Sequence, residues 1–595
     1  MAVNILDYPF DADLILQKKR AIKRELRAKE NLLPKKIAIM SGVTVGVMQD
    51  ILEIYLLANG IAPEFYQGQY GLFYENLCFD DGSLALFAPD VIYIHTSMRN
   101  LKAMPVPGDT AEDAEKLAQA EANRFLQAAK AGLALGCPVI LNNFELPPYR
   151  VMGNAEATNP GGRVRFVRRV NEILAQAADE TPNLYLNDLC YLQAQHGMDA
   201  FSDQTAWYAY KYPCALDKIP YLAQSVANII KSLLGRNKKA LALDLDNTLW
   251  GGIIGDDGPE GITMGMETPA GMAYAEFQQY LKELSALGVL LNVDSKNEEA
   301  NAVAGFERAD SVLKKDDFVC FKANWEPKSH NLVAMAKEIN IFPDSFVFID
   351  DNPAEREIIR QQVPGVAVPD LGAPEEYIHS IDRSGYFEVT NLSADDQKRV
   401  AMYKQNAARA EMQASFGDYS EYLRSLEMRG EFGHFDNAHA ERITQLINKS
   451  NQFNLPTRRY TAAEIETLIG NPDYVTLYAR LVDKFGDNGI IANVIGHVAG
   501  DVMDIDLWVM SCRVLKRDLE KAMFDKLVED AQAKGVKVIR GHYYPTAKNL
   551  LVKDFYATIG FELKSEDEAG NKEYEFVIPA DYQPQCDVME TLRVD

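Results

Sequence analysis

The sequence lacks the features of disulfide-rich, zinc-binding and membrane-spanning proteins. Its 595 residues include seven cysteines with no Cys-x-x-Cys pair, so neither a disulfide framework nor a zinc ribbon is indicated. There is no run of about 18 consecutive apolar residues, which a transmembrane helix would need. The first residues also lack a basic region followed by an apolar one, and we therefore expect a cytoplasmic protein with no membrane partner.

Positive charge is also scarce. The 61 Lys and Arg residues stand against 86 Asp and Glu residues, which gives a formal net charge of −25. Such a charge repels a phosphate backbone, so we expect no nucleic-acid partner. One basic stretch, residues 18–29, departs from this trend; a solvated helix face is the favoured interpretation, and a docking site for an acidic protein is the alternative.

Length and pattern together predict a multi-domain α/β protein. Hydrophobic residues make up 47% of the chain, which is ordinary for a folded protein, and the chain is too long for a single core. Strand-like runs at 37–40, 91–94 and 138–141 alternate with helical patterns, which favours a parallel sheet. We place this first α/β domain at residues 1–236.

Two further domains are expected, at residues 237–386 and 387–595. The first of these opens with the apolar run 240–243 and contains a helix over 271–287, which should end at Gly288. The last one combines strand-like runs with a helix over 519–533, which indicates an α+β arrangement. Its strand-like runs are 475–479, 489–496 and 503–509.

Two acids follow directly after the first strand of the second domain. Asp244 and Asp246 stand two positions apart, so their side chains should point to the same side at the carboxyl edge of a parallel sheet. One carboxylate could then attack a substrate while its neighbour moves a proton. For this motif taken alone, a solvated acidic turn is the plain structural alternative.

A second acid pair ends another apolar strand. Asp350 and Asp351 follow the run 346–349, and Glu355 comes one helical turn later. Carboxylates that converge repel one another unless a cation lies between them, and oxygen ligands favour Mg²⁺. We therefore expect a Mg²⁺ site that these acids share with Asp244.

A hydroxyl and an ammonium group stand between the two acid pairs. Ser295 lies at the end of a strand-like run, and Lys328 follows Trp-Glu-Pro. Such groups hold the equatorial oxygens of a phosphoryl group. Together with the acids, and in this order along the chain, they favour phosphoryl chemistry over an acidic turn.

This set of motifs resembles the haloacid dehalogenase (HAD) superfamily, whose domain is Rossmann-like. The resemblance implies that Asp244 is the nucleophile, which forms an aspartyl-phosphate, and that Asp246 is the general acid/base. It also implies two further groups of residues. The substrate and phosphate ligands would be Thr248, Ser295, Asn297 and Lys328, and the metal ligands Asp244, the backbone oxygen of Asp246, and Asp351, with Asp350 in support.

The connections within the second domain are short. About 20 residues separate Thr248 from the next helix and about 30 separate Ser295 from Lys328, which is too few for a cap domain. We therefore expect a capless, open site, covered locally by a flap at residues 250–258 alone.

Longer motifs resemble the FkbH-like family of this superfamily (subfamily IIIC). They lie at 243–255, 295–297, 324–328 and 349–356, and further on at 446–454, 483–486, 511–513 and 545–549. The resemblance implies that phosphate is removed from a three-carbon acyl phosphate, 1,3-bisphosphoglycerate. The glyceryl unit would then be loaded on the phosphopantetheine arm of an acyl carrier protein. Two alternatives stay open: a phosphatase for a phosphorylated sugar or glycan precursor, and a non-catalytic biosynthetic scaffold.

The third domain resembles the GNAT-like acyltransferase fold in the order of its elements. In that family a glycine-containing loop brings backbone N–H groups to a pyrophosphate, but here Lys516 and Asp518 stand at the glycine positions. Binding of CoA is thus left open, whereas a carrier arm with a single phosphate fits. We assign Cys512 a catalytic acyl relay, because the neighbouring cations favour its thiolate; a buried structural cysteine is the alternative.

The first domain resembles a flavodoxin-like hydrolase of the SGNH type. Ser41, directly after the first strand, would be the nucleophile. The expected late Asp-x-x-His motif is absent, since Gln-Thr-Ala-Trp207 follows Asp203, and no motif places His95 or His196 as a base. We expect a degenerate docking or lid module here rather than a working esterase.

Overall fold

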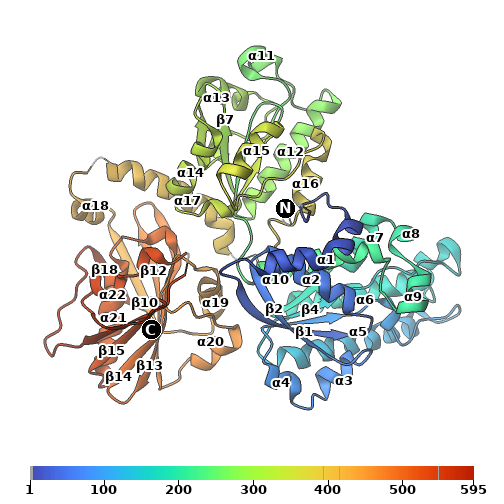
Figure 1. Ribbon diagram of the computed structural model, residues 1–595, viewed down its shortest axis with the longest axis horizontal. Helices are drawn as coiled ribbons and strands as arrows, with labels where there is room; N and C mark the ends of the chain where they lie inside the picture. Colours follow the sequence, from blue (N-terminus) through green and yellow to red (C-terminus); the bar gives the residue numbers. More distant parts are fainter. Residues whose placement is uncertain (1–4, 393, 415, 547, 595) are drawn as a thin grey trace. The chain divides into compact units, whose positions relative to one another are not determined.

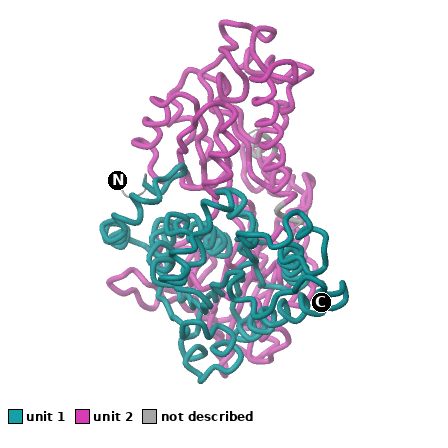
Figure 2. The backbone as a smooth tube through the Cα atoms, turned by 90° about the vertical axis from the view of Figure 1, so that its right-hand side faces the viewer, with its two compact units in different colours: residues 1–236, 388–390 teal, residues 237–387, 391–595 magenta. Residues whose placement is uncertain are grey.

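The computed structural model describes residues 5–392, 394–414, 416–546 and 548–594 (Figure 1). Contacts divide the chain into two compact units (Figure 2). Unit 1 comprises residues 1–236 and 388–390, and unit 2 comprises residues 237–387 and 391–595. Among the described residues, no helix has both the length and the apolar character that crossing a membrane requires.

Unit 1 contains a five-stranded parallel sheet with the strand order β2-β1-β3-β4-β5. Its strands are β1 (Leu33–Ser41), β2 (Ile61–Gln67), β3 (Val91–His95), β4 (Val139–Asn142) and β5 (Leu184–Asn187). The central strands read as continuous apolar runs because helices cover both faces of the sheet. This is the flavodoxin-like order that the sequence predicted, and ligands bind at the carboxyl edge of such sheets.

Two separate cores form on the two faces of this sheet, because successive strand residues point to opposite sides. Ile37 and Ile39 pack with α1, α2 and α10, whereas Ala38 and Met40 pack with α3, α5 and α6. These helices are α1 (Ala12–Arg27), α2 (Gly46–Ala58), α3 (Phe73–Cys78), α5 (Ala111–Leu133), α6 (Arg163–Glu180) and α10 (Ile219–Leu233). Shorter helices are α4 (Ser83–Phe87), α7 (Leu189–His196), α8 (Met198–Phe201) and α9 (Gln204–Tyr210).

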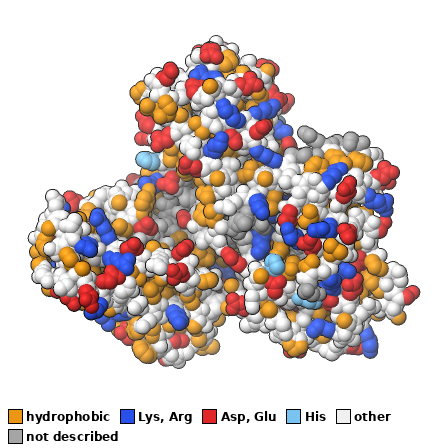
Figure 3. Space-filling model, turned by 180° about the vertical axis from the view of Figure 1, so that it is seen from behind, with side chains coloured by type: hydrophobic (Ala, Val, Ile, Leu, Met, Phe, Trp, Pro, Cys, Tyr) orange, Lys and Arg blue, Asp and Glu red, His pale blue; other side chains and the backbone are white. Residues whose placement is uncertain are grey.

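The basic stretch of the sequence lies on α1, and part of it is paired within unit 1. Lys19 and Lys23 contact Asp50 of α2 at 2.6 and 2.7 Å, and the Nε of Arg27 donates to Glu53 at 2.7 Å. On the face seen in Figure 3, acidic and basic side chains are interspersed rather than gathered by sign. The α1 pairing favours a structural role for these cations.

The first sheet of unit 2 has four parallel strands in the order β8-β7-β6-β9. They are β6 (Ala240–Leu243), β7 (Leu290–Ser295), β8 (Cys320–Ala323) and β9 (Phe346–Ile349). The strand-like run at 366–368 forms an isolated bridge from Ala367 to Val347. The associated helices are α11 (Ile254–Gly261), α12 (Pro269–Ala286), α13 (Glu299–Glu307), α14 (Lys328–Glu338), α15 (Pro353–Gln362) and α16 (Tyr377–Arg383).

The second sheet of unit 2 has nine strands, with the main order β16-β17-β15-β14-β13-β12-β10-β18 and β11 beside β14. One face packs on α21 and α22, and the other packs on α19 and α20. The strands are β10 (Met428–Gly433), β11 (Phe453–Asn454), β12 (Tyr474–Asp483), β13 (Gly486–Ala499), β14 (Val502–Met510), β15 (Val538–Tyr543), β16 (Glu562–Glu566), β17 (Lys572–Val577) and β18 (Met589–Arg593). The helices are α17 (Ala394–Ala414), α18 (Tyr419–Ser425), α19 (Ala440–Lys449), α20 (Ala462–Leu468), α21 (Leu519–Ala533) and α22 (Phe555–Thr558). Mixed strand directions and helices on both faces confirm the predicted α+β class.

A buried ion cluster ties α17 to this second sheet. The guanidinium of Arg409 on α17 donates twice to the carboxylate of Asp483, at 2.7 and 2.9 Å. Arg517, which precedes α21, reaches the same carboxylate at 3.1 Å. Asp483 also accepts the backbone N–H groups of Phe485 and Gly486, so its oxygens are fully used. Such buried charges persist only when they are paired and hydrogen-bonded.

Candidate active site

Strand register brings three acids into one row at the carboxyl edge of the four-stranded sheet. Leu243 on β6 lies opposite Ile349 on β9 and opposite Val293 on β7. The residues that follow these three positions, Asp244, Asp350 and Asp294, therefore lie side by side. A row of carboxylates at this edge is the arrangement expected for a ligand site in a parallel sheet.

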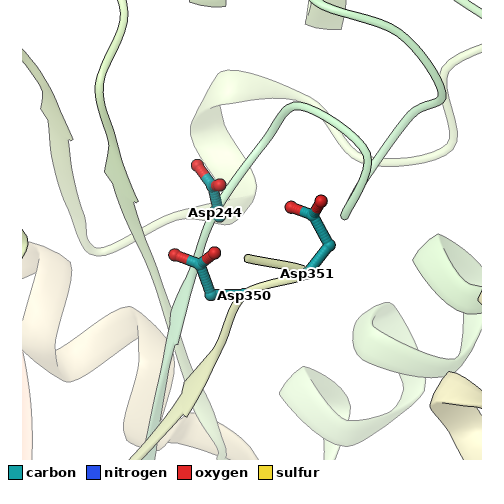
Figure 4. A group of neighbouring side chains, drawn as sticks. All are labelled: Asp244, Asp350 and Asp351. Carbon is teal, nitrogen blue, oxygen red and sulfur yellow. The ribbon is translucent and has the colours of Figure 1, made fainter. Parts of the chain in front are cut away.

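Three carboxylates converge at this edge (Figure 4). Asp244, Asp350 and Asp351 each place one oxygen within 4.8 Å of the others. Asp244 and Asp350 are buried, and Asp351 is half-buried. Among the described residues, this is the group of acids that has the geometry to hold a metal ion.

Lys328 supplies a cation to the same cluster. Its Nζ lies 2.8 Å from Asp244 Oδ2 and 2.6 Å from Asp350 Oδ2, and the side chain is 3% exposed. Burial lowers the pKa of Lys328, but the charges of Asp244 and Asp350 outweigh this and hold the pKa above its usual value. Lys328 is therefore charged at neutral pH, as a phosphate ligand has to be.

The acids of the cluster repel one another even with Lys328 in place. Burial and then the nearby charge of Asp244 raise the pKa of Asp350, while Lys328 acts in the opposite direction. The same two causes raise the pKa of Asp351. Negative charge thus exceeds positive charge at the site, and a hard divalent cation with oxygen ligands fits the residues that are present.

Asp246 is held apart from this cluster by three hydrogen-bond donors. Its Oδ1 accepts from the Trp250 ring N–H at 2.9 Å and from the backbone N–H of Ile254 at 3.0 Å. Its Oδ2 accepts from the Asn297 amide at 2.9 Å. The same amide lies 3.3 Å from the Ser295 hydroxyl, so Asn297 links Asp246 to Ser295.

Thr248 and Arg356 hold the second acid pair in place. The backbone N–H of Asp351 donates to the Thr248 hydroxyl at 3.2 Å, and that hydroxyl lies 3.4 Å from the Asp351 carboxylate. The guanidinium of Arg356 donates to the backbone oxygens of Asp350 and Asp351, both at 2.8 Å. These contacts fix the turn that follows β9.

Glu355, in contrast, does not join the carboxylate cluster. Its carboxylate pairs with Lys296 at 2.6 Å instead. The sequence placed Glu355 one turn after Asp351, but the ion pair turns its side chain toward Lys296. The expectation that this acid converges with the others was therefore wrong.

The sequence analysis missed Asp294, the third acid in the register row. Its side chain is fully buried and accepts one hydrogen bond from Asn331 at 3.1 Å, while its second oxygen has no partner among the described residues. Burial raises the pKa of Asp294 well above its usual value. The signal was available, because Asp294 directly precedes Ser295 at the end of an apolar strand.

The flap over the site is a short local excursion of the chain. Gly252 has φ +94°, a conformation that favours glycine, and its N–H donates to the Asn247 side chain at 3.0 Å. The hydroxyl of Tyr377 donates to the backbone oxygen of Asn247 at 2.9 Å. Ile253 on the flap and Trp325 before Lys328 are 46% and 67% exposed. These contacts fit the capless arrangement that the sequence predicted.

The C-terminal loop keeps the backbone shape of a glycine-containing loop without its glycines. Lys516 and Asp518 both lie in the left-handed region, with φ of 65° and 59°. Cys512 begins a short 3-10 helix over Cys512–Val514, but its side chain lies outside the described residues. The acyl relay assigned to Cys512 therefore stays a prediction.

His95 on β3 lies opposite Ser41 on β1 in the register of the parallel sheet. Ser41 is buried at the end of β1. The ring of His95 contacts the Tyr93 hydroxyl at 2.9 Å, and burial lowers the pKa of His95 to about 4. The ring of His196 packs on Tyr221. Asp203 caps α9 by accepting the N–H of Ala206.

Comparisons with known proteins show to which family and which solved structures the chain is similar. Residues 36–231 match the family model described as FkbH, N-terminal domain. The chain is similar to the N-terminal part of a Bacteroides fragilis protein that contains a phosphatase domain, crystallised as a complex with Mg. The two are 28% identical with a TM-score of 0.58, over 63% of this chain and 99% of that one. No curated protein matches the chain. The predicted resemblance to FkbH-like and HAD proteins is thus confirmed.

Acetyltransferases are also among the similar solved structures. A GNAT-family acetyltransferase from Streptococcus pneumoniae is 14% identical with a TM-score of 0.22, over 25% of this chain and 99% of that one. PaiA N-acetyltransferase from Thermoplasma acidophilum, in complex with coenzyme A, is 14% identical with a TM-score of 0.21, over 25% and 99%. At this level of similarity these structures carry no argument. The assignment of the α+β class rests on the strand topology of this chain.

Proposed function

We propose that the protein is a Mg²⁺-dependent enzyme that transfers a phosphoryl group to Asp244 and then to water. The observation that carries this proposal is the convergence of Asp244, Asp350 and Asp351 around one point, with Lys328 at 2.8 Å from Asp244. The similarity to a phosphatase domain that binds Mg supports it. A bound Mg²⁺ would neutralise charge on the phosphoryl oxygens, and Asp244, Asp351 and the backbone oxygen of Asp246 would hold it.

The residues of the chain suggest how the two steps proceed. An oxygen of Asp244 attacks phosphorus and forms an acyl phosphate, while the bond from phosphorus to the leaving oxygen breaks. Asp246 gives a proton to that leaving oxygen and later removes one from the attacking water, which releases inorganic phosphate and restores Asp244. Lys328 and Ser295 hold the phosphoryl oxygens during both steps. The hydrogen bonds from Trp250, Ile254 and Asn297 orient Asp246 for its role.

The finer proposal is that the substrate is 1,3-bisphosphoglycerate and that a glyceryl unit reaches an acyl carrier protein. The thiolate of Cys512 would attack the acyl carbon, and the phosphate on that carbon would leave. The second phosphoryl group, on the C3 oxygen, would be transferred to Asp244 and then to water, which leaves a glyceryl thioester. The glyceryl thioester would then pass to the thiol of the phosphopantetheine arm by thiol exchange. The match to the FkbH N-terminal domain and the FkbH-like motifs support this substrate and partner.

A loading assay tests the proposal. The full chain is incubated with Mg²⁺, 1,3-bisphosphoglycerate and a holo carrier protein, and the intact mass of the carrier is measured. We expect a glyceryl adduct that depends on Mg²⁺ and is lost in Asp244→Asn and in Cys512→Ala. Equal loading by wild type and Asp244→Asn would refute the mechanism.

A phosphatase for a phosphorylated sugar or glycan precursor is the second candidate, because Asp244, Asp350, Asp351 and Lys328 supply groups for phosphate release from either kind of substrate. In that case Cys512→Ala would release phosphate as fast as wild type, and no carrier adduct would form. A non-catalytic scaffold would release no phosphate from any of these substrates.

A further inference from the structure

Unit 1 contains a polar pocket of its own. Met98 and Arg99 follow β3, and Glu145 follows β4, so the pocket opens at the carboxyl edge of the five-stranded sheet. The rest of its lining comes from residues in and around α9, among them Gln204, Trp207 and Tyr212. This edge is where parallel α/β sheets bind ligands.

Two cations lie over the ring of Trp207, and one of them, Arg99, lines the pocket together with Trp207. The guanidinium of Arg99 lies 5.2 Å and the Nζ of Lys211 lies 5.3 Å from the ring centre. Arg99 donates one N–H to the Gln204 side chain at 2.9 Å, and Lys211 donates to the backbone oxygen of Tyr208 at 3.3 Å. In the part of unit 1 that the structure describes, neither cation forms an ion pair with a carboxylate. Two like charges on one ring repel, and an anion would relieve this.

Two acids, Glu145 and Asp203, also line the pocket. Glu145 is 4% exposed and accepts the backbone N–H of Met98 at 3.1 Å. Burial raises the pKa of Glu145 to about 8, so its carboxyl group is protonated near neutral pH and has a hydrogen-bond donor to offer. Asp203 is exposed at the rim, and one of its oxygens is used in capping α9.

We infer that this pocket binds a small organic anion through its carboxylate, which Arg99 holds and Glu145 contacts from the other side. The parallel N–H groups of an arginine guanidinium and the O–H of a protonated carboxyl group can donate hydrogen bonds to the two oxygens of a carboxylate. A phosphate offers more acceptor oxygens than these donors would satisfy. The contact of Arg99 with Gln204 and Trp207 fixes the guanidinium in advance, which lowers the entropy cost of binding. This site does not depend on the function proposed for Asp244.

Calorimetric titration of the full chain tests the inference. Glycerate and acetate are the carboxylate probes, inorganic phosphate is the competing anion, and glycerol is the neutral control. We expect saturable binding of glycerate that weakens about tenfold or more in Arg99→Gln, because a charge-assisted hydrogen bond is lost. Arg99→Lys should retain part of the affinity, since it keeps the positive charge but cannot donate two parallel hydrogen bonds. Arg168→Gln, on an exposed position of α6, should bind as wild type does.

Two further measurements separate the outcomes. Binding at the Asp244 site would persist in Arg99→Gln and vanish in Lys328→Met, whereas binding at the pocket would do the opposite. Glu145→Gln keeps the acceptor for the Met98 N–H and still offers an N–H donor, so it should fold and should bind glycerate nearly as wild type does. The inference is overturned if no carboxylate binds, if Arg99→Gln binds glycerate as wild type does, or if phosphate binds the pocket more tightly than glycerate.

Discussion

The ammonium group of Lys328 lies 2.8 Å from the carboxylate of Asp244, and both side chains are almost wholly buried. Asp244 follows β6, whereas Lys328 begins α14, 84 positions later in the sequence. Asp350 shares the same ammonium at 2.6 Å. Lys328 therefore pairs with both buried acids of the folded site, and in the proposed reaction it would also hold the phosphoryl group. A variant at this position should lose both properties.

Lys328→Met removes the cation and leaves two buried carboxylates without it. We expect the free energy of unfolding to fall by about 3–5 kcal/mol, as when one partner of a buried ion pair is removed. Phosphate release should fall by about 10²–10³, since a donor to the phosphoryl oxygens is lost. Urea denaturation and a phosphate-release assay measure the two effects. Lys337→Met, on the exposed side of the same helix, should change neither quantity.

Mg²⁺ should stabilise the folded chain, because it binds the acid cluster of the native state alone. At a concentration about 100 times its dissociation constant, the gain in the free energy of unfolding is about 2.7 kcal/mol. Thermal denaturation with and without Mg²⁺ measures this gain. Asp351→Asn should reduce it strongly, whereas Asp316→Asn, at an exposed position, should leave it intact. A Mg²⁺ effect that is the same in wild type and Asp351→Asn would place the ion elsewhere.

The pH dependence of stability should reveal the buried Glu145. Its pKa is raised from 4.5 to about 8 in the folded chain, so between these values the unfolded chain has lost a proton that the folded chain keeps. The free energy of unfolding therefore falls as pH rises through this window, by about 1.4 kcal/mol per pH unit. Glu145→Gln cannot ionise and should escape this loss. The difference between variant and wild type, from denaturation at pH 4 to 8, should grow with pH; a constant difference would contradict the assignment.

The ion cluster around Asp483 should be essential to the second sheet of unit 2. Asp483→Asn leaves Arg409 and Arg517 buried beside a neutral group, and we expect a loss of about 3–5 kcal/mol in the free energy of unfolding. Asp487→Asn breaks the exposed pair with Arg480 and should cost about 0–1 kcal/mol. Chemical denaturation compares the two. Similar losses in both variants would show that burial of the cluster has little effect.

Much of the fold could be predicted from the sequence, because an apolar run that ends in an acid or a serine can be recognised from neighbouring residues alone. The runs that end at Asp244, Ser295 and Asp350 became three of the four parallel strands. The helix expected at 519–533 is α21. The run at 366–368 formed only a bridge, since strand formation depends on the neighbouring backbone and not on the local pattern alone.

The site was less fully predictable, because side-chain pairing depends on tertiary contacts. Glu355 was expected among the acids, but Lys296 is near enough in space to pair with it. Asp294 was visible at the end of an apolar strand, directly before Ser295, but its place beside Asp244 follows from the register between β6 and β7. The pocket around Arg99 joins residues from β3, β4 and α9 loops, and no motif connects them.

Mapping the phosphorylated residue tests the central claim most directly. The chain is mixed with Mg²⁺ and an acyl phosphate substrate, the reaction is quenched with acid, and the acyl phosphate on the protein is reduced with borohydride before peptide mass spectrometry. The label should fall on Asp244 and be absent in Asp244→Asn, which should also release no phosphate. A label on another residue, or phosphate release by Asp244→Asn at the rate of wild type, would contradict the account.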